Sequence, residues 1–163
     1  MERLVRTVSN ALMWVACLAI TLMMLHVTFD VFGKYVFRTP VPATFEAVEV
    51  YYMVWLVFLP FAYVARGEGQ IFVELFTRSL KPRVMGLIDV GAGVLALVWL
   101  LLLVWYSGEE AVTMTQEGEF RQISEGFIYM WPSRWVIPIG CAAMALAVVA
   151  RIGQDLSTAI RDR

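Results

Sequence analysis

Four long apolar stretches constrain this chain more than any other feature of its sequence. They cover about residues 11–35, 44–65, 84–107 and 132–151, and charged residues, proline or glycine bound each one. A helix needs about 20 apolar residues to cross a hydrocarbon core about 30 Å thick, because it rises about 1.5 Å per residue. The stretches are too long and too continuous for the alternating pattern of a membrane β-barrel. We therefore predict an all-α integral membrane protein with four transmembrane helices.

The composition agrees with a membrane protein and argues against several soluble classes. Of 163 residues, 60% are hydrophobic and 17% are charged, whereas soluble domains average about 45–50% and 25%. The net charge of -1 gives no basic excess for nucleic-acid binding. Cys17 and Cys141 lie in separate apolar stretches, and the single histidine, His26, cannot supply both axial ligands of a bis-histidine haem. We expect no cofactor, no metal site and no nucleic-acid partner.

The distribution of basic residues predicts how the helices are oriented. The N-terminal, 66–83 and C-terminal segments together carry nine Lys and Arg residues, whereas the segments on the other side carry four. By the positive-inside rule, both termini are expected in the cytoplasm. The connections are too short for a separate soluble domain, so we expect a single four-helix membrane domain over residues 1–163.

The connection between the second and third stretches has an amphipathic pattern. One helical face carries Ile71, Phe72, Leu75, Phe76 and Leu80, and the other carries Gln70, Glu74, Thr77, Arg78 and Lys81. This pattern predicts a short helix over about residues 70–81 that lies in the cytoplasmic interface. Its apolar face would contact membrane lipid or another membrane subunit.

Ionisable residues gather where the first two stretches meet. Asp30, Lys34 and Arg38 follow at i, i+4 and i+8, and Glu46 and Glu49 follow at i and i+3 after a short turn. The Asp30–Lys34 spacing favours an ion pair on one helix face, and the short turn predicts that the two groups face each other. The cluster is either an ion or proton site or a neutralised ladder that fixes how two helices meet. Its position near a helix end favours the ladder.

Three further features allow more than one interpretation. His26 lies about one turn before Asp30 and could shuttle a proton, although a hydrogen bond within the bundle is the more common use. The predicted outer loop 108–131 has five glutamates against Arg121, and it is either a docking surface or a solvated loop. The fourth stretch carries a face of small residues that permits close helix approach, namely Gly140, Ala143, Ala147 and Ala150.

Five short patterns occur in order along the chain. They are Asp30, Lys34, Tyr35 and Phe37; Pro40 and Pro42 before Glu46 and Glu49; residues 54–59 with Trp55 and Phe58; residues 65–74 with Gln70; and Trp131-Pro132 followed by residues 137–140. Together they resemble the small, Q-type membrane subunit of tripartite ATP-independent periplasmic (TRAP) transporters. That family often has arginine at Lys34 and histidine at Gln70. Pro60 replaces a residue that is usually small there, and we expect it to kink the second helix.

The resemblance implies a subunit of a secondary transporter in the bacterial inner membrane that takes up organic acids with an ion gradient, usually of sodium. A large multi-span transport subunit would hold the substrate and ion sites, and a periplasmic solute-binding protein would deliver the substrate. The small subunit would be a membrane scaffold that also helps to dock the binding protein. Ten residues would then serve the structure of this subunit and its contacts with the others, and not catalysis or substrate binding. They are Asp30, Lys34, Arg38, Pro40, Pro42, Glu46, Glu49, Trp55, Phe58 and Gln70.

Two other functions fit parts of the pattern. A small four-helix multidrug exporter has a similar topology, but it needs a carboxylate near the middle of a helix, usually the first, and residues 14–25 contain none. A membrane anchor subunit of a respiratory enzyme would lack a histidine pair for haem, although it could contact quinone without one. A scaffold with no role in transport is the broadest alternative.

Overall fold

The computed structural model describes residues 2–39, 41–66, 82–123 and 126–161 of the chain. The predicted interfacial helix over residues 70–81, with Gln70, lies outside the described residues, as do Pro40 and Glu125.

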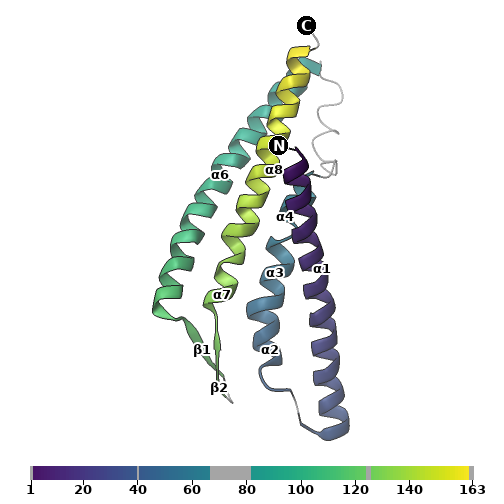
Figure 1. The fold of residues 1–163 in the computed structure, drawn as a ribbon, viewed down its shortest axis with the longest axis vertical. Coiled ribbons are helices and arrows are strands. Elements are labelled where there is room, and N and C mark those ends of the chain that lie inside the picture. Colours follow the sequence, from purple (N-terminus) through teal and green to yellow (C-terminus); the bar gives the residue numbers. More distant parts are fainter. Residues whose placement is uncertain (1, 40, 67–81, 124–125, 162–163) are drawn as a thin grey trace.

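The first half of the chain forms a helical hairpin (Figure 1). Helix α1, Glu2–Phe32, continues into the π-helical segment η1, Gly33–Phe37. After the turn, the return helix consists of α2, Thr44–Ala47; the π-helical segment η2, Val48–Tyr52; α3, Met53–Phe58; and α4, Phe61–Arg66. The two π-helical segments therefore lie on either side of the turn, at the end where the sequence places its charged cluster.

Pro60 interrupts the return helix, which confirms the predicted kink. Helix α3 ends at Phe58, and α4 begins at Phe61. Proline has no backbone N–H to donate and its ring clashes with the preceding helical turn, so a regular helix cannot pass through it. Beyond the break, the backbone N–H groups of Tyr63 and Val64 both donate to the Pro60 carbonyl, at 2.9 Å each, which starts the new helix.

The second half begins with α6, Pro82–Glu117, which is longer than the stretch predicted to end near residue 107. The prediction of a loop over residues 108–131 is therefore wrong for its first ten residues, 108–117, which are helical. A short antiparallel hairpin follows, made of β1, Phe120–Ile123, and β2, Gly126–Tyr129. Hydropathy did not predict where this helix ends, because it indicates burial in the membrane and not helix formation. The polar residues after 107 still favour a helix.

The last helix is the centre of the bundle. A short α7, Trp131–Arg134, leads into α8, Val136–Arg161, which lies beside α6 and also contacts α4, α1 and α3 (Figure 1). One buried cluster joins Ala16, Leu59 and Val136, and a second joins Leu100, Cys141 and Ala145. Ala143 and Ala147 are also buried, so the small-residue face of the fourth stretch does pack against neighbouring helices.

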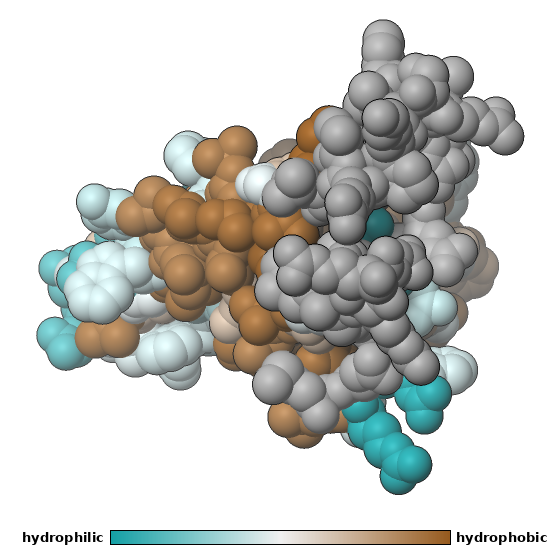
Figure 2. All heavy atoms as spheres, turned by 90° about the horizontal axis from the view of Figure 1, so that it is seen from above, coloured by the Kyte–Doolittle hydropathy of each residue, from teal (hydrophilic) through white to brown (hydrophobic). Residues whose placement is uncertain are grey.

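Four helical segments among the described residues are long and apolar enough to cross a membrane: Arg3–Phe37, Thr44–Arg66, Val90–Glu117 and Trp131–Gly153. Only 6% to 39% of their most apolar windows is buried within the chain. Apolar side chains therefore cover much of the outer surface, and the end-on view of Figure 2 shows apolar residues gathered around the middle of the bundle. This surface needs lipid or a partner, which confirms the predicted all-α membrane fold.

We use two names for the ends of this bundle. The hairpin end contains the turn after η1 and the β1–β2 hairpin, and the terminal end contains both chain termini (Figure 1).

Candidate functional site

Asp30 fastens the end of the first helix to the turn that follows it. Its side chain is buried, and its Oδ2 accepts a hydrogen bond from Nζ of Lys34 at 2.6 Å. The Oδ1 atom accepts a second hydrogen bond, at 2.9 Å, from the backbone N–H of Val41. The predicted i, i+4 ion pair is therefore confirmed. The same carboxylate also fixes the backbone of the turn, because hydrogen bonds to a charged acceptor are stronger than neutral ones.

The two charged groups, which were expected to face each other across the turn, form no ion pair with one another among the described residues. Glu49 binds Arg121 of the β-hairpin instead, with 3.1 Å between its Oε2 and the arginine Nη1. Within the described part of the chain, Arg38 and Glu46 take part in no ion pair. The physical reason is local, because Asp30 already neutralises Lys34 and η2 presents Glu49 to the hairpin. Arg38 ends η1 in the left-handed region, with φ of 55°.

His26 connects the first two helices near the hairpin end. Its Nε2 lies 3.4 Å from Oγ1 of Thr44, and its Nδ1 lies 3.5 Å from the hydroxyl of Tyr52. Thr44 also donates to the carbonyl of Val41 at 3.0 Å, the residue whose N–H binds Asp30. The expectation of hydrogen bonding within the bundle is confirmed. Both contacts are long for hydrogen bonds, so they are weak individually.

The β-hairpin is held to the helices by contacts that the sequence did not reveal. Arg134 makes a bidentate pair with Glu119, through Nε to Oε2 at 3.0 Å and Nη2 to Oε1 at 2.8 Å. The hydroxyl of Tyr51 on η2 donates to the carbonyl of Tyr129 on β2. With the Arg121–Glu49 pair, these bonds connect residues up to 78 positions apart. Local spacing carries no signal for contacts at such separations.

The Glu119–Arg134 pair predicts a pH dependence for the hairpin. The hydrogen bonds that Arg134 donates to the Glu119 carboxylate hold the pKa of this carboxyl below its ordinary value of 4.5. A lowered pKa means that the pair stabilises the folded hairpin fully above about pH 4.5, and that this stability is lost as the pH falls through the lowered value. The protection factors of the amide hydrogens of residues 126–130, which compare measured with intrinsic exchange rates, should therefore fall only in that acidic range. Glu119→Gln should remove this pH dependence, and an unchanged profile in that variant would contradict the assignment.

The remaining predicted site residues lie in different places. Pro42 is exposed in the turn. The side chain of Trp55 packs against the cluster of Ala16, Leu59 and Val136, and its indole N–H is buried with no hydrogen-bond partner among the described residues. Phe58 contacts both core clusters. The sequence patterns around these two aromatic residues therefore mark packing, where the second helix meets the first and the last.

Phe58 also explains why a glycine occupies position 140. A Cβ at Gly140 would lie 2.3 Å from the carbonyl oxygen of Phe58 and 2.8 Å from its carbonyl carbon. Helix α8 thus passes directly over the backbone at the Pro60 break, where only glycine permits the approach. Sequence reasoning identified Gly140 as one of several small residues, but it did not identify this partner.

The described residues contain no group of three or more His, Cys, Asp or Glu side chains that could hold a metal ion. The polar groups at the hairpin end instead form a set of bonds that fix helix ends and the β-hairpin relative to one another. What this arrangement supplies is a rigid end on a bundle with a large apolar surface.

Comparison with known proteins identifies the family of this bundle. The family model described as "Tripartite ATP-independent periplasmic transporters, DctQ component" matches residues 23–158. The match contains Asp30, the turn, the β-hairpin and most of α8, and no curated protein matches the chain. DctQ proteins are transporter components that work with a large membrane subunit, DctM, and a periplasmic binding protein. The chain therefore belongs to the DctQ family, the small membrane component of the tripartite ATP-independent periplasmic transporters.

Proposed function

We propose that this chain is the membrane scaffold on which the large subunit of an organic acid importer assembles. The transporter would lie in the bacterial inner membrane and use a sodium gradient. Both termini of the chain would face the cytoplasm, so the hairpin end would face the periplasm and help to dock the solute-binding protein. One observation carries the scaffold role. The ion pairs found among the described residues join elements of this chain to one another, so their charges serve the structure of the bundle.

The apolar surface supports assembly with a membrane partner. Helix α6 exposes large side chains along its length, including Leu95, Trp99 and Trp105, which are 65% to 73% exposed. Its apolar residues are distributed around the helix instead of forming one stripe, so packing against α8 leaves much of the helix uncovered. A scaffold for a larger membrane protein would use such a surface.

The hairpin end offers charged groups to a soluble partner. Glu109 and Glu110 are exposed on α6 near this end, and Arg38 is exposed at the turn. Charged groups at the rim of a docking surface mainly steer association and set specificity. Docking of the binding protein on this end is consistent with that distribution, and it would involve the helical part of the predicted acidic loop.

A pair of double variants tests these roles. Glu46→Ala with Glu49→Ala removes the anchor of Arg121 and should lower both the recovery of the large subunit and the transport rate, without changing the order of substrate preference. Glu109→Ala with Glu110→Ala removes the same charge, but it should keep full recovery of the large subunit. The readouts are co-purification from membranes and uptake in cells. A changed substrate preference in the first variant would contradict the scaffold role, because the substrate site would then involve this chain.

A further inference from the structure

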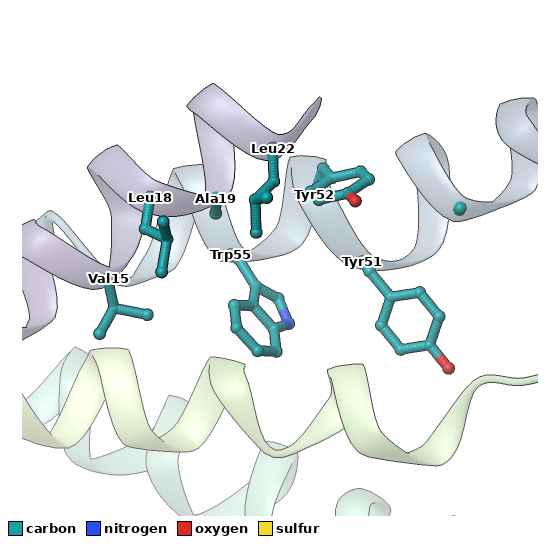
Figure 3. A pocket seen from close by; sticks show the side chains of 8 residues that line it. Val15, Leu18, Ala19, Leu22, Tyr51, Tyr52 and Trp55 are labelled. Carbon is teal, nitrogen blue, oxygen red and sulfur yellow. The ribbon is translucent and has the colours of Figure 1, made fainter. Parts of the chain in front are cut away.

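An apolar groove runs along the first two helices. It has a volume of about 310 Å³, and its walls include Val15, Leu18 and Leu22 of α1 and Tyr51, Tyr52 and Trp55 of the η2–α3 segment. In Figure 3 the side chains of Trp55 and Tyr51 extend from the second helix past those of α1, toward α8. The leucines are 46% and 59% exposed, so the groove opens on the outside of the bundle.

The groove lies at membrane depth, in the half next to the hairpin end. Arg66 marks the terminal side, where its Nη1 lies 3.4 Å from the carbonyl oxygen of Arg6. From Arg6 to Leu22 is sixteen residues, or about 24 Å along the helix at 1.5 Å per residue. A hydrocarbon core about 30 Å thick that starts near Arg6 therefore encloses the whole groove. Because that depth contains no water, hydrocarbon or a partner's apolar side chains must fill it.

The size of the groove excludes a whole helix and admits a thinner occupant. A transmembrane helix with its side chains is about 10–12 Å wide, too wide to enter a groove of about 310 Å³ between two helices of this hairpin. An extended acyl chain is thin enough to lie along it. The groove is also continuous with the apolar surface that the four spanning helices expose.

Polar groups gather where the groove ends. Tyr51 lines the groove, and its hydroxyl binds Tyr129 of the hairpin. Arg121 of the same hairpin pairs with Glu49, two residues before Tyr51, at 3.1 Å, and the two side chains are 46% and 48% exposed. A cation and an anion side by side complement the phosphate and the ammonium group of a zwitterionic phospholipid. The buried N–H of Trp55, which has no hydrogen-bond partner among the described residues, lies one helical turn deeper and points toward Tyr51 in Figure 3.

We propose that this groove binds one acyl chain of a zwitterionic phospholipid from the leaflet at the hairpin end, with its headgroup at the Arg121–Glu49 pair. The lipid would fill space between α1 and the second helix that protein side chains leave open. It would thus be a bound structural lipid, distinct from the exchanging lipid along α6.

Fluorescence quenching by brominated lipid tests this proposal on the full chain in detergent. Trp55 is kept as the sole tryptophan by replacing Trp14, Trp99, Trp105, Trp131 and Trp135 with phenylalanine. Phosphatidylethanolamine brominated on its acyl chains should quench Trp55 saturably, at about one lipid per chain, because bromine quenches indole on contact. Ala47 also lines the groove, so Ala47→Phe, which fills it with a larger side chain, should abolish this quenching. Arg121→Gln should raise the half-saturating lipid concentration about tenfold, the loss of one charge-assisted contact.

A matched chain that keeps only Trp99, which is 65% exposed on α6, should show gradual quenching without saturation. Native mass spectrometry of the unaltered chain provides a second measurement, in which one retained phospholipid should disappear with Ala47→Phe. Equal quenching of Trp55 with and without the Ala47→Phe substitution would overturn the proposal. Absence of Trp55 quenching in a preparation that retains the large subunit would also overturn the proposal, because the partner's side chains would then occupy the groove.

Discussion

Replacing Gly140 with alanine is expected to separate α8 from the second helix. The added Cβ would lie 2.3 Å from the carbonyl oxygen of Phe58 and 2.8 Å from its carbonyl carbon. Both are backbone atoms, so no rotation of a side chain relieves the overlap. The backbone there is already fixed by the break at Pro60, between α3 and α4. The helices must therefore move apart, which also opens the two core clusters that Phe58 contacts.

Gly140→Ala should lower the free energy of unfolding by an amount at the upper end of about 1–3 kcal/mol, the usual cost of added atoms in a packed core. Thermal unfolding of the purified chain in detergent measures it. Gly91→Ala is the matched control, because a Cβ at Gly91 would meet no atom of the described residues within 4 Å and alanine favours a helix by about 0.5–1 kcal/mol over glycine. Gly140→Ala should lower the midpoint while Gly91→Ala keeps or raises it. Equal midpoints for the two variants would show that α8 does not cross the break at this distance.

Replacing Asp30 with alanine is expected to release the turn between the first two helices. The change leaves the backbone N–H of Val41 without its acceptor and Lys34 without its counter-charge. Asp30 is buried, and both of its hydrogen bonds are made to a charged acceptor, so losing them costs more than losing neutral hydrogen bonds. The turn also positions Thr44, which contacts His26, so the loss should spread along both helices.

A graded series separates the two functions of this carboxylate. Asp30→Asn keeps an acceptor for Val41 but loses the charge, so its unfolding midpoint should fall between those of the unaltered chain and Asp30→Ala. Glu46→Gln is the control, because Glu46 makes no ion pair within the described part of the chain, and it should leave the midpoint unchanged. If Asp30→Ala unfolded at the same temperature as Glu46→Gln, the account of the turn would be wrong.

Features with a local cause could be predicted from the sequence. The four spanning helices follow from the length of the apolar stretches, the Asp30–Lys34 pair follows from helical spacing, and the break at Pro60 follows from its missing N–H. In each case the residues that decide the outcome lie within a few positions of one another or share one continuous stretch. The all-α membrane fold could thus be predicted before the structure was known.

Features that depend on distant partners could not be predicted. Nothing around Glu49 indicates that Arg121 neutralises it from 72 positions away, and the same holds for the contact of Gly140 with Phe58. The extension of α6 beyond residue 107 was missed because the apolar pattern ends there while the helix does not. The β-hairpin was hidden in a polar segment, although Phe127, Ile128 and Tyr129 are residues that favour strands. Roles in subunit contact for the ten residues named from the sequence stay predictions.

Co-purification of this chain from its native membrane, in mild detergent, tests the central claim most directly. The scaffold account predicts that one large membrane protein with many more spans is recovered at about an equal molar ratio. It also predicts that this recovery falls when Glu46 and Glu49 are replaced by alanine. Recovery of the chain only as its own dimer would contradict the account, and it would favour a small self-contained exporter.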